Sequence, residues 1–168
     1  DGDRVGIYGH SGGGFLTTAA LLQYPDVFDV GVASSGNHEN DVYNRWWSET
    51  HHGVEKTVND SGEVAWEYDV GKNSALAGHL EGNLLLTTGT IDNNVHPANT
   101  YRMAKALIEA GKRFDFFVFP GQRHGYGGMD DYWFWLRAEY FAEHLLNDGR
   151  DRADVTPLQQ ETPASDRP

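Results

Sequence analysis

The chain has 168 residues, which suits one domain, and its composition is 39% hydrophobic and 12% aromatic. Its formal net charge of -12 argues against nucleic-acid binding, which needs a cationic surface. The absence of Cys excludes disulfides, thiolate nucleophiles and cysteine-ligated metals. No apolar run approaches the roughly 20 residues that span a bilayer, so we expect a globular protein.

The chain opens on Asp-Gly-Asp-Arg, without Met and without an apolar segment behind it. This opening shows no signal peptide, and we expect the chain to begin inside a longer protein. Because a chain without Cys fits either redox compartment, the sequence leaves the location open. A periplasmic or secreted location is favoured over a cytoplasmic one.

The first half of the chain predicts two strands and one helix. Residues 5–8 are a short, mostly apolar strand, residues 15–23 an Ala- and Leu-rich helix, and residues 27–34 a second strand. The segment 36–82 is a long polar and aromatic connection whose periodicity is too weak to interpret.

The second half continues the alternation of strands and helices. The expected elements are strands 84–88 and 114–119 and helices 97–110 and 132–146, the last capped by Asp130 and Asp131. Strands that alternate with helices predict an α/β fold with about four parallel strands. We expect one domain over residues 1–146, followed by a polar, disordered tail over residues 147–168.

The strongest local motif is the segment 9–14, which reads Gly-His-Ser-Gly-Gly-Gly. It lies between a predicted strand and a predicted helix, which is the setting of a nucleophile elbow with Ser11 as the nucleophile. Glycines flank such a serine because a Cβ would collide with the neighbouring strand or helix. The backbone N–H of Gly12 would form half of an oxyanion hole. The alternatives are a Gly-rich turn with a chance serine and a phosphate loop, although the latter lacks the Gly-x-x-x-x-Gly-Lys pattern.

A serine nucleophile needs a base and a group that orients the base. In α/β-hydrolases these follow the serine in the order acid, then histidine, at the carboxyl ends of strands. Asp92 follows the third predicted strand, and His124 follows the fourth in a Gly-bounded loop. The alternatives are a helix-capping role for Asp92 and a solvated loop position for His124, with His96 as a rival base that fits a helix start.

The other histidines fit a catalytic role less well. His10 adjoins the serine, but we expect its side chain to point the other way. The pair His51 and His52 lacks acidic residues at ligand spacing, so we predict no metal site and no cofactor.

Three segments together resemble the prolyl oligopeptidase family of serine peptidases, and within it the dipeptidyl peptidase IV branch. They are residues 4–14 (RVGIYGHSGGG), 89–96 (GTIDNNVH) and 118–125 (VFPGQRHG). The resemblance runs from about residue 3 to residue 146. It implies the C-terminal half of an α/β-hydrolase catalytic domain, completed by an upstream β-propeller and the first hydrolase strands. The family's second oxyanion donor, a tyrosine hydroxyl, and the glutamates that bind a free amino terminus lie in that upstream part.

The resemblance also implies a substrate pocket. Tyr43 matches the first aromatic of a pair that walls the family's proline-sized pocket, and Trp47 stands where the family usually has Tyr. Asn94 matches a residue that binds a substrate carbonyl, and Val95 one that lines the pocket. From the residues alone, this aromatic segment fits core packing equally well. Two further departures lie beside the serine, where His10 replaces a usual Trp and Gly12 a usual Tyr.

The sequence therefore predicts a serine peptidase that works through an acyl-enzyme, with removal of N-terminal dipeptides after Pro or Ala as one specificity. The alternatives are a carboxylesterase or lipase on the same fold, or a non-catalytic α/β-hydrolase module that binds a partner. The expected partners are a peptide substrate and the upstream part of the same protein. A sheet with an unpaired edge also leaves a homo-oligomer open.

Overall fold

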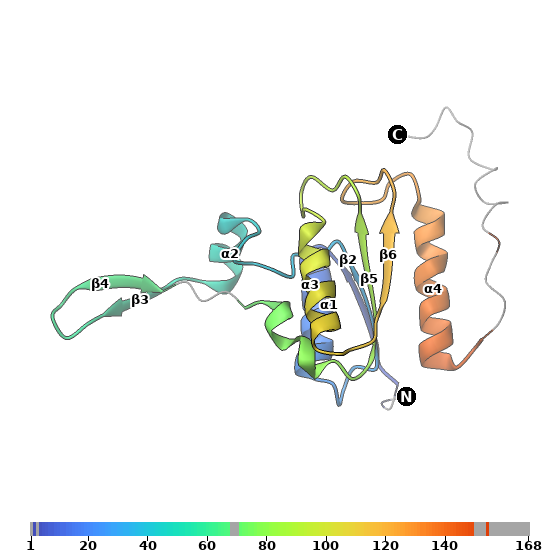
Figure 1. Cartoon of the computed structure of the whole chain (residues 1–168), viewed down its shortest axis with the longest axis horizontal. Coiled ribbons are helices and arrows are strands. Elements are labelled where there is room, and N and C mark those ends of the chain that lie inside the picture. Colours follow the sequence, from blue (N-terminus) through green and yellow to red (C-terminus); the bar gives the residue numbers. More distant parts are fainter. Residues whose placement is uncertain (1, 3, 68–70, 150–153, 155–168) are drawn as a thin grey trace.

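A four-stranded parallel sheet forms the centre of the molecule (Figure 1). The computed structural model describes residues 2, 4–67, 71–149 and 154. The strand order is β1 (Gly6–His10), β2 (Val30–Ser34), β5 (Asn83–Gly89) and β6 (Asp115–Phe119). Every pairing in this sheet is parallel, so the predicted α/β fold with four parallel strands is confirmed.

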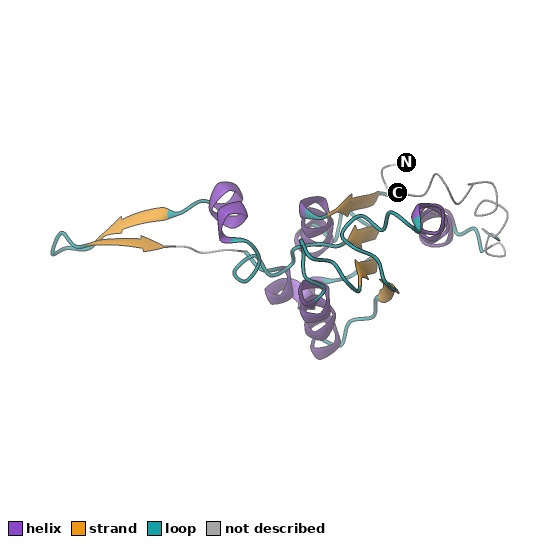
Figure 2. Ribbon diagram, turned by 90° about the horizontal axis from the view of Figure 1, so that it is seen from above, coloured by secondary structure: helices purple, strands orange, loops and turns teal. Residues whose placement is uncertain are grey.

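Helices cover both faces of the sheet (Figure 2). Helices α1 (Gly12–Gln23) and α3 (Ala98–Glu109) lie on one face, and α4 (Asp130–Leu146) lies on the other. Because successive strand residues point to opposite faces, the central strands β2 and β5 contribute side chains to two apolar cores. On the α1 and α3 side these residues include Leu21, Leu22, Ala33, Leu84, Leu86, Met103 and Leu107. On the α4 side they include Val30, Val32, Leu85 and Tyr140.

The boundaries of all seven predicted elements differ from those observed, and three of the differences have a clear physical reason. Strand β2 begins at Val30 rather than at residue 27, because a turn precedes it in which the Val27 N–H donates to the Tyr24 carbonyl at 3.0 Å. Helix α4 begins at Asp130, so the two aspartates lie in its first turn and do not cap it. Helix α1 begins directly after Ser11, because the Phe15 N–H donates to the Ser11 carbonyl at 3.0 Å.

The segment 36–82 contains elements that the sequence did not reveal. They are α2 (Arg45–His52), the 3-10 helix η1 (Asn73–His79), and the strands β3 (Glu55–Val58) and β4 (Val64–Glu67). The two strands pair antiparallel in a hairpin that projects from the body of the molecule (Figure 1). Almost all of its residues are exposed, so its strands carry no buried face for periodicity to reveal. The start of α2 did have a signal, because the Asn44 side chain accepts from the N–H of Trp46 at 3.0 Å and so caps the helix.

None of the described helices is both long and apolar enough to cross a membrane. Helix α4 ends at Leu146, and Asn147 follows in the left-handed region with a φ of 53°. Most of the predicted tail, residues 147–168, lies outside the described residues, so the disordered tail and the domain boundary at residue 146 stay predictions.

Candidate active site

Ser11 lies at the tight junction between β1 and α1. Its φ of 58° and ψ of -121° belong to a region that non-glycine residues rarely adopt. The Ser11 N–H donates to the Ser34 carbonyl of β2 at 2.8 Å, which fixes the junction against the sheet. Gly12 is the first residue of α1, so its N–H has no acceptor within the helix. This strand–turn–helix geometry is that of a nucleophile elbow, with a free donor next to the serine.

The glycines around Ser11 are not all required for the same reason. A Cβ on Gly9 would collide with the carbonyl group of Gly13, and one on Gly14 would lie 2.6 Å from the Ser34 carbonyl oxygen. A Cβ on Gly13 would meet nothing within 4 Å. The steric argument from the sequence therefore holds for Gly9 and Gly14 and fails for Gly13.

Asp92 and His124 are in hydrogen-bond contact at the carboxyl edge of the sheet. The His124 Nδ1 lies 2.8 Å from the Asp92 Oδ2. The Asp92 side chain is 0% exposed and that of His124 is 21% exposed. The other carboxylate oxygen, Oδ1, accepts from the N–H groups of Asn94 at 2.9 Å and Val95 at 3.0 Å. Asp92 thus shapes its own turn and holds the imidazole, and it does not cap the following helix, since Pro97 stands at the N-cap of α3.

Hydrogen bonds distinguish the two candidate bases, His96 and His124. The Ala98 N–H donates to His96 Nδ1 at 3.2 Å, so His96 serves the start of α3, where the sequence had put it. Among the described residues, the Ser11 hydroxyl makes no hydrogen bond to His124. Serine–histidine contacts commonly tighten only when substrate is bound.

His10 lies against the candidate base, and the expectation that its side chain points elsewhere is wrong. The ring centroids of His10 and His124 are 4.5 Å apart. His10 ends β1 at the same edge of the sheet that the His124 loop crosses, so the two rings meet. Burial lowers the pKa of His10, the charge of His124 lowers this pKa further, and that of Asp92 raises it.

A buried cluster of hydroxyl groups supports the His124 loop. The hydroxyl of Tyr126 lies 2.9 Å from Ser35 Oγ and 3.1 Å from Thr87 Oγ1. The Ser35 hydroxyl donates to the His124 carbonyl at 3.4 Å. Burial raises the pKa of Tyr126, against the opposing effect of these hydrogen bonds. Sequence reasoning missed Tyr126, although its place two residues after His124, between glycines, was a usable signal.

Three of the four predicted pocket residues lie together beside the elbow. The Tyr43 hydroxyl donates to Asn94 Oδ1 at 3.1 Å, and the ring centroids of Tyr43 and Trp47 are 5.9 Å apart. The Trp47 indole faces Gly12 so closely that a Cβ there would lie 3.1 Å from the ring. Burial raises the pKa of Tyr43, and the charge of Asp92 adds to this rise. The fourth residue, Val95, is 1% exposed, and its contact with a substrate stays a prediction.

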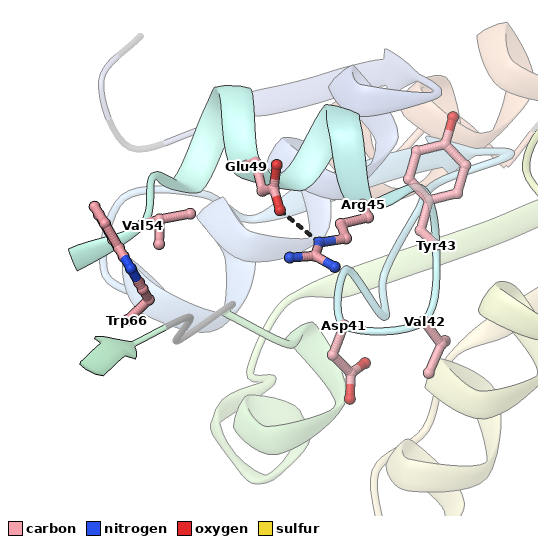
Figure 3. A pocket seen from close by; sticks show the side chains of 7 residues that line it. All are labelled: Asp41, Val42, Tyr43, Arg45, Glu49, Val54 and Trp66. Atoms are coloured by element: carbon pink, nitrogen blue, oxygen red, sulfur yellow. Dashed lines mark hydrogen bonds and ion pairs between the residues drawn. The ribbon is translucent and has the colours of Figure 1, made fainter. Parts of the chain in front are cut away.

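A pocket of about 370 Å³ adjoins this aromatic wall (Figure 3). Within it, Arg45 Nε lies 2.5 Å from Glu49 Oε1, one turn along α2. Trp66 and Val54 come from the two chain segments at the base of the hairpin. The lining residues are Asp41, Val42, Tyr43, Arg45, Glu49, Val54 and Trp66. The pocket shares Tyr43 with the aromatic wall, and its lining includes none of Ser11, Asp92 and His124.

Metal chemistry has no clear site in the part of the chain that the structure describes. There, no three His, Asp or Glu side chains converge as metal ligands do. His51 and His52 instead pack against Trp47, with ring centroids 4.4 and 5.8 Å from the indole.

The sequence profile of the prolyl oligopeptidase family matches residues 1–148. Dipeptidyl peptidase 8 of Mus musculus is 35% identical over 150 residues, which are 88% of this chain and 16% of that protein. Prolyl endopeptidase FAP of Homo sapiens is 30% identical over 151 residues, which are 88% of this chain and 19% of that protein. The crystal structure of Porphyromonas gingivalis dipeptidyl peptidase 4 superposes with a TM-score of 0.69 and 31% identity, over 88% of this chain and 20% of that one.

The Porphyromonas gingivalis structure shares this fold, and the chain spans only 16% to 20% of the lengths of these three relatives. The sheet is accordingly part of an α/β-hydrolase domain. The chain belongs to the prolyl oligopeptidase family of serine peptidases.

Proposed function

We propose that the protein cleaves peptides through an acyl-enzyme on Ser11, with His124 as the base and Asp92 as the residue that orients it. The observation that carries this proposal is the 2.8 Å contact between His124 Nδ1 and the buried Asp92 carboxylate, at the sheet edge where the Ser11 elbow lies. A buried carboxylate on Nδ1 fixes the tautomer whose Nε2 can accept a proton, and it stabilises the imidazolium that forms.

The proposed reaction has two halves. His124 Nε2 takes the hydroxyl proton as Ser11 Oγ attacks the scissile carbonyl, and the Gly12 N–H stabilises the oxyanion. The C–N bond then breaks, the leaving amine takes the proton from His124, and the acyl group stays on Ser11. Water attacks the acyl-enzyme, with His124 again taking and returning one proton. The partial positive charge at the start of α1 favours the oxyanion in both halves.

For the substrate, we propose a peptide held against Tyr43 and Trp47, with Asn94 bound to a substrate carbonyl and Val95 behind the pocket. Aromatic side chains of this kind suit a flat apolar ring such as proline. The name of one similar protein, a prolyl endopeptidase, supports cleavage next to proline, and the names of two dipeptidyl peptidases support the release of dipeptides. Removal of N-terminal dipeptides after Pro or Ala is the specificity that we propose, with the amino-terminal contacts supplied by the upstream part of the same protein.

The nucleophile is tested by covalent labelling of the full-length protein with a fluorophosphonate probe. We expect Ser11→Ala to lose all labelling, because the probe phosphonylates only an activated serine hydroxyl. Ser61→Ala, in the exposed turn of the β3–β4 hairpin, is the matched control and should label like the wild type. Undiminished labelling of Ser11→Ala would sink the assignment, and an unlabelled wild type would favour a non-catalytic binding module.

A comparison of two substrates separates a peptidase from an esterase. An Xaa-Pro anilide should be cleaved with a larger kcat/KM than a short acyl ester, because only the peptide can use the Tyr43 and Asn94 contacts. A larger value for the ester would point to a carboxylesterase on the same fold.

A further inference from the structure

His10 is held in place by a residue that also holds the proposed nucleophile. The His10 Nδ1 lies 2.6 Å from the Ser34 Oγ. Ser34 is fully buried in β2, and its carbonyl accepts the Ser11 N–H. One β2 residue thus fixes both the backbone of Ser11 and one nitrogen of the His10 ring.

The other side of this arrangement is the proposed base. The His10 and His124 ring centroids are 4.5 Å apart with the planes inclined at 55°, and the ring of Tyr126 lies 6.0 Å from His10, edge to face. His10 therefore borders the base, while the Asp92 carboxylate holds the Nδ1 of His124. A ring that touches the base limits its rotation when Nε2 must point at Ser11.

The charge state of His10 decides whether its contact with His124 stabilises or destabilises the His124 imidazolium. The titratable groups that face it are His124 and Tyr126 on the loop after β6 and Asp92 on the loop after β5. A neutral aromatic ring is a favourable neighbour for the imidazolium that His124 becomes during proton transfer. A protonated His10 repels that imidazolium, and burial of the ring already disfavours this charged form.

We propose that His10 is a positioning residue for the proposed base, because its neutral ring holds His124 in place. When His10 takes up a proton at low pH, its positive charge either displaces the His124 ring or prevents His124 from holding a proton, and the enzyme is switched off. This inference rests on the proposed function, since it concerns the same base. The proposal adds a second histidine whose protonation controls activity, beyond the histidine that a catalytic triad requires. It also gives a role to a residue that stands where the family usually has a Trp, which cannot titrate.

The first test is the pH dependence of kcat/KM for an Xaa-Pro anilide with the full-length protein. If both imidazoles must be neutral, log kcat/KM should fall with a limiting slope of about 2 on the acid side. His10→Phe keeps a ring but cannot titrate, so its slope should be about 1, with a loss of about threefold on the plateau. His10→Ala also removes the ring and should lose about thirtyfold in kcat with little change in KM.

His79→Phe is the matched control, because this exposed histidine lies at the end of η1. It should keep the slope of the wild type. A slope of 1 in the wild type, or an unchanged slope in His10→Phe, would overturn the proposal. Tryptophan fluorescence at each pH confirms that the protein remains folded over the range that is fitted.

A second readout does not depend on catalysis. Deuterium exchange at the imidazole C2 position, followed by mass spectrometry, gives the protonation midpoint of each histidine separately. The His10 midpoint should lie below 6.5 in the wild type and rise in His124→Gln, where the repelling charge is gone. If the protonation midpoint of His10 is the same in His124→Gln as in the wild type, the interaction between the two histidines is refuted even when the enzyme is active. A shifted midpoint in a protein that fluorophosphonates do not label refutes the proposed function and leaves the coupling standing.

Discussion

His38 is a histidine that the fold keeps without charge. It is completely buried before α2, and its Nδ1 lies 3.2 Å from the side-chain nitrogen of Asn73. Burial lowers the pKa of His38 from 6.5 to about 3. Below pH 6.5 the unfolded chain therefore binds a proton that the folded chain does not bind, so the free energy of unfolding decreases as the pH falls from about 6.5 towards about 3.

The replacement His38→Gln removes this linkage. We expect the variant to be less stable than the wild type at pH 7, because Gln packs the site less well. Between pH 7 and pH 5 it should lose about 2 kcal/mol less than the wild type, since one fewer group takes up a proton on unfolding. Urea unfolding of the full-length protein at both pH values measures the difference. Equal losses in the two proteins would show that His38 already carries its charge in the fold.

The candidate catalytic residues follow from the sequence more directly than their neighbours do. Ser11, Asp92 and His124 each follow a predicted strand, and parallel strands bring such residues to one edge. The direction of a side chain at the end of a strand is not encoded in this pattern. The contact of His10 with His124 depends on the geometry of the Ser11 junction and of the loop after β6, and the strand pattern contains neither.

At the scale of the element, α1 offers two adjacent glycines with opposite surroundings. Gly14→Ala brings a Cβ to 2.6 Å from the Ser34 carbonyl, and the backbone on both sides is fixed. We expect it to destabilise the fold by about 1–3 kcal/mol, as overpacking does. Gly13→Ala meets nothing within 4 Å and should stabilise the fold by about 0.5–1 kcal/mol, because alanine favours the helix.

Thermal unfolding of the two variants beside the wild type measures this contrast. A Gly13→Ala variant as unstable as Gly14→Ala would mean that the elbow needs glycine for conformational reasons and that the contact with β2 is not the cause.

The elements that the sequence predicted are those with a buried face. The run 84–88 is apolar because β5 is covered on both sides by helices, so its composition reveals it. The hairpin of β3 and β4 buries almost nothing, and α2 buries only Ser48. The apolar residues of these elements therefore show no periodicity that would distinguish them from a loop. Local capping by Asn44 was the one readable signal there.

At the scale of the whole molecule, β1 is an end strand of the sheet. In the part of the chain that the structure describes, β1 pairs only with β2. Its Tyr8 is 62% exposed, with the Arg137 guanidinium 4.4 Å from the ring centre. An unpaired strand edge with exposed aromatic surface is a template for association.

We expect the 168-residue chain, produced alone, to form dimers or larger species through β1. Tyr8→Lys should shift the population towards monomer, since charge at a strand edge opposes pairing. Val58→Lys, on the exposed hairpin, is the matched control and should leave the population as it is. Light scattering over a range of concentrations decides: a wild-type chain that stays monomeric, or dissociation by Val58→Lys alone, would contradict edge pairing through β1.

The close approach of Trp47 to Gly12 ties together two positions that lie far apart in the chain. With the indole 3.1 Å from the place of a Cβ, a larger residue after the serine has room only if position 47 becomes smaller or turns away. Replacing both residues one at a time therefore passes through an intermediate in which the space between positions 12 and 47 is either crowded or empty. We therefore expect a laboratory library that varies position 12 to yield more folded variants when position 47 is varied with it.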